Sequence, residues 1–195
     1  MASSATSSYA ISPLIFGSTQ SNLNNESIKE ALRCLRVVGG WDALGNVARA
    51  AGAGHPSLAS SFRSFALARH AAAHDATSDV SLPDLVTFGQ VSLSTALAFD
   101  ALVSRACRRL GEGDQVLLEG GDGAVEANEI EFAFVEERSG GAREMRHGST
   151  STLKNHASVE SAMASAAQRP SNKGRVVVRL DSRGVPSAWH TTDLP

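Results

Sequence analysis

Arginine and histidine side chains placed close together can cleave RNA without a metal ion. Histidine titrates near neutral pH, so it can take the proton of a ribose 2′-hydroxyl or protonate the leaving 5′-oxygen. Arginine stays cationic and offers a fork of N–H donors to phosphate oxygens. In this chain Arg69, His70 and His74 lie in one short segment, residues 68–75. Cleavage by such residues gives a 2′,3′-cyclic phosphate and a 5′-hydroxyl.

The bare pattern, an arginine and then a histidine after four to six intervening residues, is not specific. With fifteen arginines and six histidines in 195 residues, chance alone gives about 1.4 such pairs. The chain contains four of them: Arg49/His55, Arg63/His70, Arg69/His74 and Arg183/His190. The first pair straddles a Gly-rich break and the last spans a predicted turn and strand. Only the two middle pairs therefore lie on one predicted helix.

The directions of these side chains on a helix decide which of them can act together. At about 100° per residue, Arg63, His70 and His74 fall within about 40° of each other. Arg69 points about 140° away from His74 and lies on the apolar stripe of the same helix, with Leu58, Phe62 and Phe65. Either the stem of Arg69 lies along apolar surface with its head in water, or Arg69 meets a second subunit. Arg69 and His74 converge only if the helix loosens near Ala72 or if a dimer brings them together.

Four helices are predicted before Gly111. Ser27 and Glu30 have the spacing of a capping box, and Gly39-Gly40 ends the first helix. Apolar residues recur at helical spacing in each segment, and the predicted helices span residues 27–38, 41–51, 57–74 and 83–110. The fourth helix is apolar around most of its circumference, so it is central or covered by another subunit. We therefore expect a homodimer formed through the third and fourth helices.

After Gly111 the pattern changes to short strands and turns. It predicts a strand candidate at 116–118, strands at 129–138, 175–180 and 185–190, turns at 120–123, 139–141 and 181–184, and a short helix at 158–168. His147 and His156 lie in polar sequence and are expected to be solvated. The predicted fold class is an α-helical bundle in residues 25–110, followed by a small α+β module of unknown function in residues 115–195. Residues 1–24, rich in Ser and Thr, are predicted to form a flexible arm.

The segment Leu67–Asp75, with Asn25–Leu32 and Gly40-Trp41 upstream, resembles the HEPN family and in particular its RiboL-PSP-like branch. The similarity covers roughly residues 24–110 and does not reach the α+β part. The resemblance implies an all-α bundle that dimerises with its two motifs facing each other across the interface. It also implies a metal-independent endoribonuclease in which Arg69 and His74 are catalytic and His70 orients His74 or contacts the RNA.

The biological role that this resemblance implies is a toxin of a toxin–antitoxin pair or an antiviral-defence effector. The expected partners are then an RNA substrate, a second copy of the chain, and an antitoxin or other regulatory protein. Two other functions stay open at this point. One is a non-catalytic HEPN dimer module that binds RNA or a protein partner, and the other is a structural adaptor that binds through its α+β half.

Charge and composition limit the partners further. The net charge is −2, with nine basic against seven acidic residues in 1–110 and nine against thirteen in 111–195. Neither part is basic enough for a general nucleic-acid binder, so RNA would be contacted in a cleft or between subunits. Arg105, Arg108 and Arg109 are expected to complement the negative end of the fourth helix.

Metal, membrane and export signals are not evident in the sequence. Neither cysteine has a second Cys or a His at ligand spacing, and no acidic cluster or Cys/His set suggests a metal site, so no metal or cofactor is expected. Cys34 and Cys107 are expected to be core thiols. The chain has no run of 18 apolar residues, and its first residues lack the basic start of a secretory signal. We therefore expect a cytoplasmic protein with no membrane partner.

Overall fold

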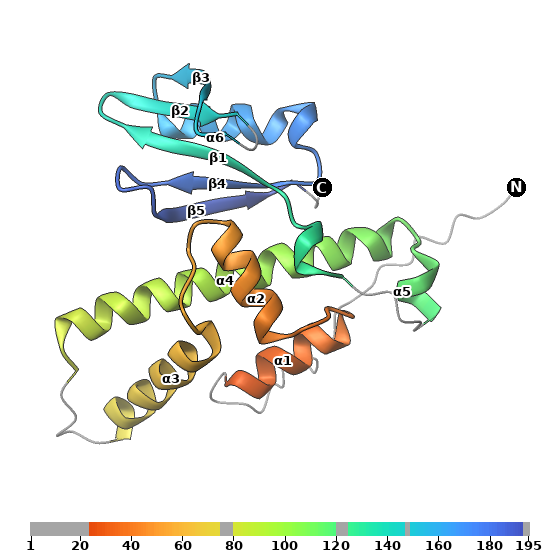
Figure 1. Ribbon diagram of the computed structural model, residues 1–195, viewed down its shortest axis with the longest axis vertical. Helices are drawn as coiled ribbons and strands as arrows, with labels where there is room; N and C mark the ends of the chain where they lie inside the picture. Colours follow the sequence, from red (N-terminus) through yellow and green to blue (C-terminus); the bar gives the residue numbers. More distant parts are fainter. Residues whose placement is uncertain (1–23, 75–79, 120–124, 147–148, 193–195) are drawn as a thin grey trace, which may run out of the picture.

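The chain folds into three layers. The computed structural model describes residues 24–74, 80–119, 125–146 and 149–192. A group of helices packs on one face of a five-stranded sheet, and helix α6 covers the opposite face (Figure 1). The expected fold class, helices followed by an α+β module, is confirmed.

The first layer holds five helices: α1 (Asn25–Cys34), α2 (Trp41–Ala50), α3 (Leu58–His74), α4 (Leu82–Gly111) and the short α5 (Gln115–Glu119). Helix α1 is capped by Asn24, whose side chain accepts the Ser27 amide at 2.9 Å, so it begins before the predicted cap. It also ends earlier than predicted. Arg36 has a φ of 59° and Val37 pairs with Val125 in a parallel bridge, which takes the chain out of the helix.

The second layer is a mixed sheet of strand order β3-β2-β1-β4-β5. Its strands are β1 (Phe132–Arg138), β2 (Gly141–Met145), β3 (Thr152–His156), β4 (Val176–Leu180) and β5 (Pro186–Thr191). Strands β1 and β4 are parallel, and every other pair is antiparallel. A parallel pair needs a crossover, and α6 (Val159–Gln168), with the short 3₁₀ turn η3 (Pro170–Asn172), belongs to that connection.

Several predicted elements of this half are confirmed within a few residues: α6, β4, β5, the hairpin turn at Gly140 and the turn after β4. The strand predicted from 129 starts only at Phe132, because Ala127–Glu129 form the 3₁₀ turn η2. The strand predicted at 116–118 is wrong, since these residues lie in α5. Strands β2 and β3 were not predicted, and the turn at 120–123 lies outside the described residues.

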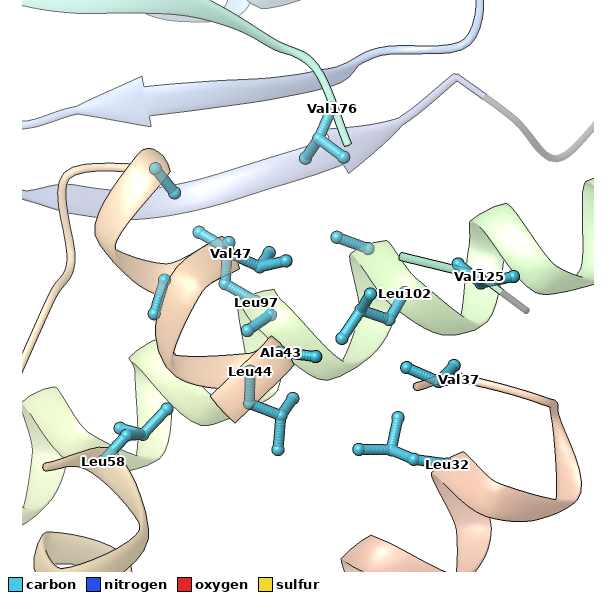
Figure 2. Packing of buried hydrophobic residues seen from close by; sticks show 14 of the residues in the cluster. Leu32, Val37, Ala43, Leu44, Val47, Leu58, Leu97, Leu102, Val125 and Val176 are labelled. Carbon is cyan, nitrogen blue, oxygen red and sulfur yellow. The ribbon is translucent and has the colours of Figure 1, made fainter. Parts of the chain in front are cut away.

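The helices and the sheet share one hydrophobic core. Leu97 and Leu102 of α4 and Val47 of α2 are fully buried, and they cluster with sheet residues that include Phe132, Val176 and Val178. Figure 2 shows Val176 on the sheet side of the cluster, with Val47 and Leu97 on the helix side. A smaller cluster under α6, with Val135, Val177 and Ala162, fills the other face of the sheet. The predicted domain limits stay a prediction, but the two halves are packed on each other by apolar contacts.

Helix α4 runs along the whole helical layer (Figure 1). Among the described residues, α4 is the helix whose length and composition would allow it to cross a membrane. In the structure, 39% of its most apolar stretch is buried. From Val91 to Ala106 it supplies many residues of the shared core. Core helices of this kind meet the same criterion, so the expected absence of a membrane partner stays a prediction.

Candidate functional site

The motif arginine and histidines lie on α3, which aromatic contacts anchor to its neighbours. Trp41 of α2 contacts Phe62 with ring centres 5.2 Å apart, and Phe65 contacts Phe88 of α4 at 5.3 Å. Phe62 and Phe65 also meet edge to face at 6.1 Å. Such pairs contribute about 0.5–1.5 kcal/mol each beyond the area that they bury. The first half of α3 is therefore fixed against α2 and α4.

Beyond Phe65, α3 leaves the core. Residues 66–74 of α3 and 82–90 of α4, which we call the α3–α4 tip, extend past the other helices (Figure 1). The tip exposes four large apolar side chains to solvent: Leu67 at 62%, Leu82 at 73%, Leu85 at 54% and Val86 at 56%. The candidate catalytic residues lie on this tip. They lie on the helix that also exposes Leu67, and not in a cleft of the sheet.

Within the tip, His70 and His74 lie side by side. Their ring centres are 4.5 Å apart with the planes inclined at 56°, and both residues are exposed. This contact follows from their i, i+4 spacing on a regular helix. Cys34, predicted to be a core thiol, is exposed on α1, whereas Cys107 is half-buried.

Arg69 does not join His70 and His74 on that face. Helix α3 is continuous through His74, so the loosening near Ala72 that could turn Arg69 toward His74 is not present. On a regular helix the two side chains point about 140° apart. The buried part of the apolar stripe ends at Phe62, with Phe65 half-buried, and Arg69 is exposed. One chain therefore presents the histidine pair and the arginine on different sides of the helix.

The other arginine–histidine pairs have separate surroundings. Arg49 donates to the side chain of Asn46 at 2.9 Å within α2. Arg183 forms an ion pair with Asp181 at 3.0 Å in the turn between β4 and β5. Arg63 is exposed two turns before His70 on α3. Interpreting the pairs at 49/55 and 183/190 as incidental is consistent with these local roles.

The arginines at the end of α4 bind carboxylates. Arg105 and Arg109 both donate to Glu129 of η2, at 3.2 and 3.0 Å, and Arg109 also donates to Asp114 at 2.8 Å. The hydrogen bond from Arg109, helped by the backbone N–H of Leu117, lowers the pKa of Asp114. Arg105 and Arg109 were expected only to complement the negative end of α4. Their ion pairs with Glu129 also connect α4 to the segment that leads into β1.

A polar cluster that the sequence did not suggest lies between β2, β3 and α6. Glu144 is 2% exposed and accepts hydrogen bonds from Arg169 and Ser165, and its Oε1 lies 2.7 Å from Nε2 of His156. Burial raises the pKa of Glu144, and the hydrogen bonds with Ser165, Arg169 and His156 lower it. The hydrogen bonds have the larger combined effect, so the pKa of Glu144 lies below its ordinary value. The expected solvation of His156 is wrong, because only 7% of its side chain is exposed. His147 lies outside the described residues.

A cavity of about 190 Å³ adjoins this cluster at one end of the sheet. Glu144, Asn172 and Arg175 contribute to its lining, and no residue of α3 does. Arg175 already donates to Glu131 at 2.8 Å and to the carbonyl of Ser171 at 2.6 Å. Glu144 and Arg175 therefore both have partners within the fold, and the cavity is separate from the motif on α3.

Comparisons with known proteins add no assignment. No protein-family model, no curated protein and no solved structure matches the chain. The resemblance to the HEPN family rests on the residues of α1, α2 and α3 quoted above and stays a prediction.

Proposed function

We propose that this chain is a metal-independent endoribonuclease of HEPN type whose active site is completed by a second copy. The observation that carries the proposal is the position of Arg69, His70 and His74 on an exposed helix end that also carries the exposed Leu67. Arginine and histidine are the residue types that metal-free RNA cleavage needs.

A second copy would resolve two chemical difficulties. Arg69 and His74 diverge on the continuous helix α3, so the arginine that faces a given His74 would come from the partner chain. One histidine also cannot act as base and acid in the same step, whereas a dimer supplies two His74 side chains. One would take the proton of the ribose 2′-hydroxyl while the other protonates the 5′-oxygen. Arg69 would stabilise the charge on the phosphorane, and His70 would orient His74 or contact the RNA.

The α3–α4 tip would supply the apolar surface for that dimer. Leu67 and Leu82 are more than half exposed, as are Leu85 and Val86. Leu82, Leu85 and Val86 share one face of α4 by their i, i+3 and i+4 spacing, and clustered apolar exposure of this kind marks interaction surfaces. In a twofold dimer the same patch occurs on both chains, so the motifs on both copies of α3 come to the same interface.

The wider role follows from the family resemblance alone. The chain would act in the cytoplasm as a toxin or an antiviral-defence effector, with RNA as its substrate and an antitoxin or other regulatory protein as its partner. Neither a cofactor nor a metal ion takes part in the proposed reaction.

A non-catalytic HEPN dimer module that binds RNA or a protein partner is the second candidate. The observation that favours it is charge: arginines outside α3, among them Arg105, Arg109 and Arg143, are engaged with carboxylates rather than arranged as an RNA-binding surface. Such a module would keep the fold and the dimer but would not turn over RNA.

Incubation of the purified chain with total RNA in EDTA distinguishes the two candidates. The ribonuclease proposal expects fragments that end in 2′,3′-cyclic phosphates and begin with 5′-hydroxyls, at a rate that EDTA does not reduce. RNA that is bound but stays intact over hours at micromolar protein would contradict the ribonuclease proposal and support the non-catalytic module.

A further inference from the structure

The two histidines of the tip have the arrangement of a metal chelate. Two histidines at i and i+4 on one helix face are the spacing with which helices present imidazoles to zinc. Here the rings of His70 and His74 are already in contact, with centres 4.5 Å apart, and both are open to solvent. No rearrangement of the backbone is needed for both rings to reach one ion.

The distance between the rings agrees with shared coordination. A metal–nitrogen bond of about 2.1 Å places a ring centre about 3.2 Å from the ion, so two imidazoles about 90–110° apart have centres about 4.5–5.2 Å apart. The observed 4.5 Å lies at the short end of that range. Small rotations of the two exposed side chains would therefore direct one nitrogen of each ring at the same point.

One feature of the surroundings, the negative end of the helix, favours a cation. His74 is the last residue of α3, where the unpaired carbonyl groups give the helix a negative end. The helix contains no acidic residue, so its histidines are not held by a carboxylate from their own helix, and its two arginines, Arg63 and Arg69, oppose the cation. Among the described residues no group of three His, Cys, Asp or Glu side chains could hold a metal ion, so water would fill the remaining coordination positions.

We propose that His70 and His74 form a two-imidazole binding site for a divalent transition-metal ion of the zinc type. Imidazole nitrogen suits Zn²⁺, Ni²⁺ and Cu²⁺, whereas Mg²⁺ prefers oxygen ligands. The site uses the same two histidines as the proposed reaction, but metal binding does not require that the reaction take place, and the reaction itself uses no metal. One consequence rests on the proposed function. When Zn²⁺ binds an imidazole, it takes the nitrogen lone pair that would otherwise accept a proton. Zn²⁺ at this site therefore inhibits RNA cleavage, and EDTA restores it.

Calorimetric titration of Zn²⁺ into the full chain, prepared without a histidine tag, tests the site. The parent binds Zn²⁺ saturably and does not bind Mg²⁺. His70→Ala and His74→Ala each weaken Zn²⁺ binding more than about tenfold, since even the loss of a group that only orients a ligand costs about 10–100-fold. His190→Ala is the matched control, because His190 is an exposed histidine on β5, and it binds like the parent.

A second variant tests the geometry while keeping the number of histidines. In Ala72→His/His74→Ala the two imidazoles stand at i and i+2 and point about 160° apart, so they cannot chelate one ion. It binds as weakly as His74→Ala if the proposal is right. Parental Zn²⁺ affinity in this variant, equal affinity in all variants, or no binding by the parent would overturn the proposal. Circular dichroism at 222 nm confirms that each variant keeps its helices.

The binding and cleavage results separate the two proposals. Zn²⁺ binding that depends on both histidines, in a chain that leaves RNA intact, supports the metal site and contradicts the ribonuclease. RNA cleavage by a chain that does not bind Zn²⁺ supports the ribonuclease and contradicts the metal site.

Discussion

Shortening a fully buried leucine of α4 should destabilise the helices and the sheet together. Leu102 is 0% exposed and belongs to the core cluster that also contains Phe132, Val176 and Val178. Figure 2 shows Leu102 and Val176 within this cluster. Leu102→Ala removes three carbon atoms, which at about 0.8 kcal/mol each lowers the free energy of unfolding by about 2.4 kcal/mol. A residual cavity of about 40 Å³ adds about 1 kcal/mol.

The expected total is therefore about 3 kcal/mol, which for a chain of this size lowers the melting temperature by about 6–12 °C. The chain has two tryptophans, Trp41 on α2 and Trp189 on β5. In a Trp41→Phe background, the fluorescence of Trp189 reports on the sheet while circular dichroism at 222 nm reports mainly on the helices. Leu118→Ala is the control, because Leu118 is 50% exposed and its loss should change the free energy by less than about 0.5 kcal/mol.

We expect both signals of Leu102→Ala to fall in a single transition at the same lowered temperature. A helical transition that moves while the Trp189 transition stays at the parental temperature would refute the argument. So would two separate transitions in the parent, since they would mean that the helices and the sheet do not depend on one core.

Further expected outcomes concern single contacts. Because hydrogen bonds lower the pKa of Glu144, its carboxylate stabilises the fold above its ordinary pKa of 4.5 and loses that contribution as the pH falls through the lower folded value. Urea unfolding should thus show that Glu144→Gln is less stable than the parent at pH 7 by about 1.5–3 kcal/mol, and that the difference narrows in acid. Trp189→Phe removes the 2.7 Å hydrogen bond to Asp100 and should cost about 1–3 kcal/mol by the same assay, whereas an unchanged stability would mean that this bond is not formed in solution. Leu85→Asp places a charge on the apolar tip and should shift the chain from dimer to monomer in analytical ultracentrifugation; a parent that is already monomeric at micromolar concentration would count against a shared site. His70→Ala should reduce RNA cleavage less than His74→Ala does, and equal rates for the parent and His70→Ala would remove His70 from the site.

Local patterns predicted the elements that local forces decide. The apolar spacing of α2, α3 and α4 and the contact between His70 and His74 follow from 3.6 residues per turn. The run 116–118 is short and apolar, which periodicity alone cannot assign to helix or strand, and it lies in α5.

Contacts between distant residues explain most of what the sequence did not predict. Helix α1 ends before Val37 because Val37 pairs with Val125. Strand β2 was missed because Glu144 is a charged residue at an inward position, and its partners His156 and Arg169 come from other elements. The divergence of Arg69 from His74 was foreseen from helix geometry, but whether another arginine faces His74 cannot be predicted from the pattern of one chain.

Arg69 and His74 are the residues proposed to cleave RNA. The rate of RNA cleavage in EDTA by three single variants tests this proposal most directly. His74→Ala should lower the rate about 10²–10⁴-fold, because proton transfer by a positioned side chain contributes that much. Arg69→Ala should lower it about 10²–10³-fold through lost stabilisation of the phosphorane. Arg63→Ala, an exposed arginine on the same helix, should cleave at the parental rate. Parental rates in both His74→Ala and Arg69→Ala would contradict the claim.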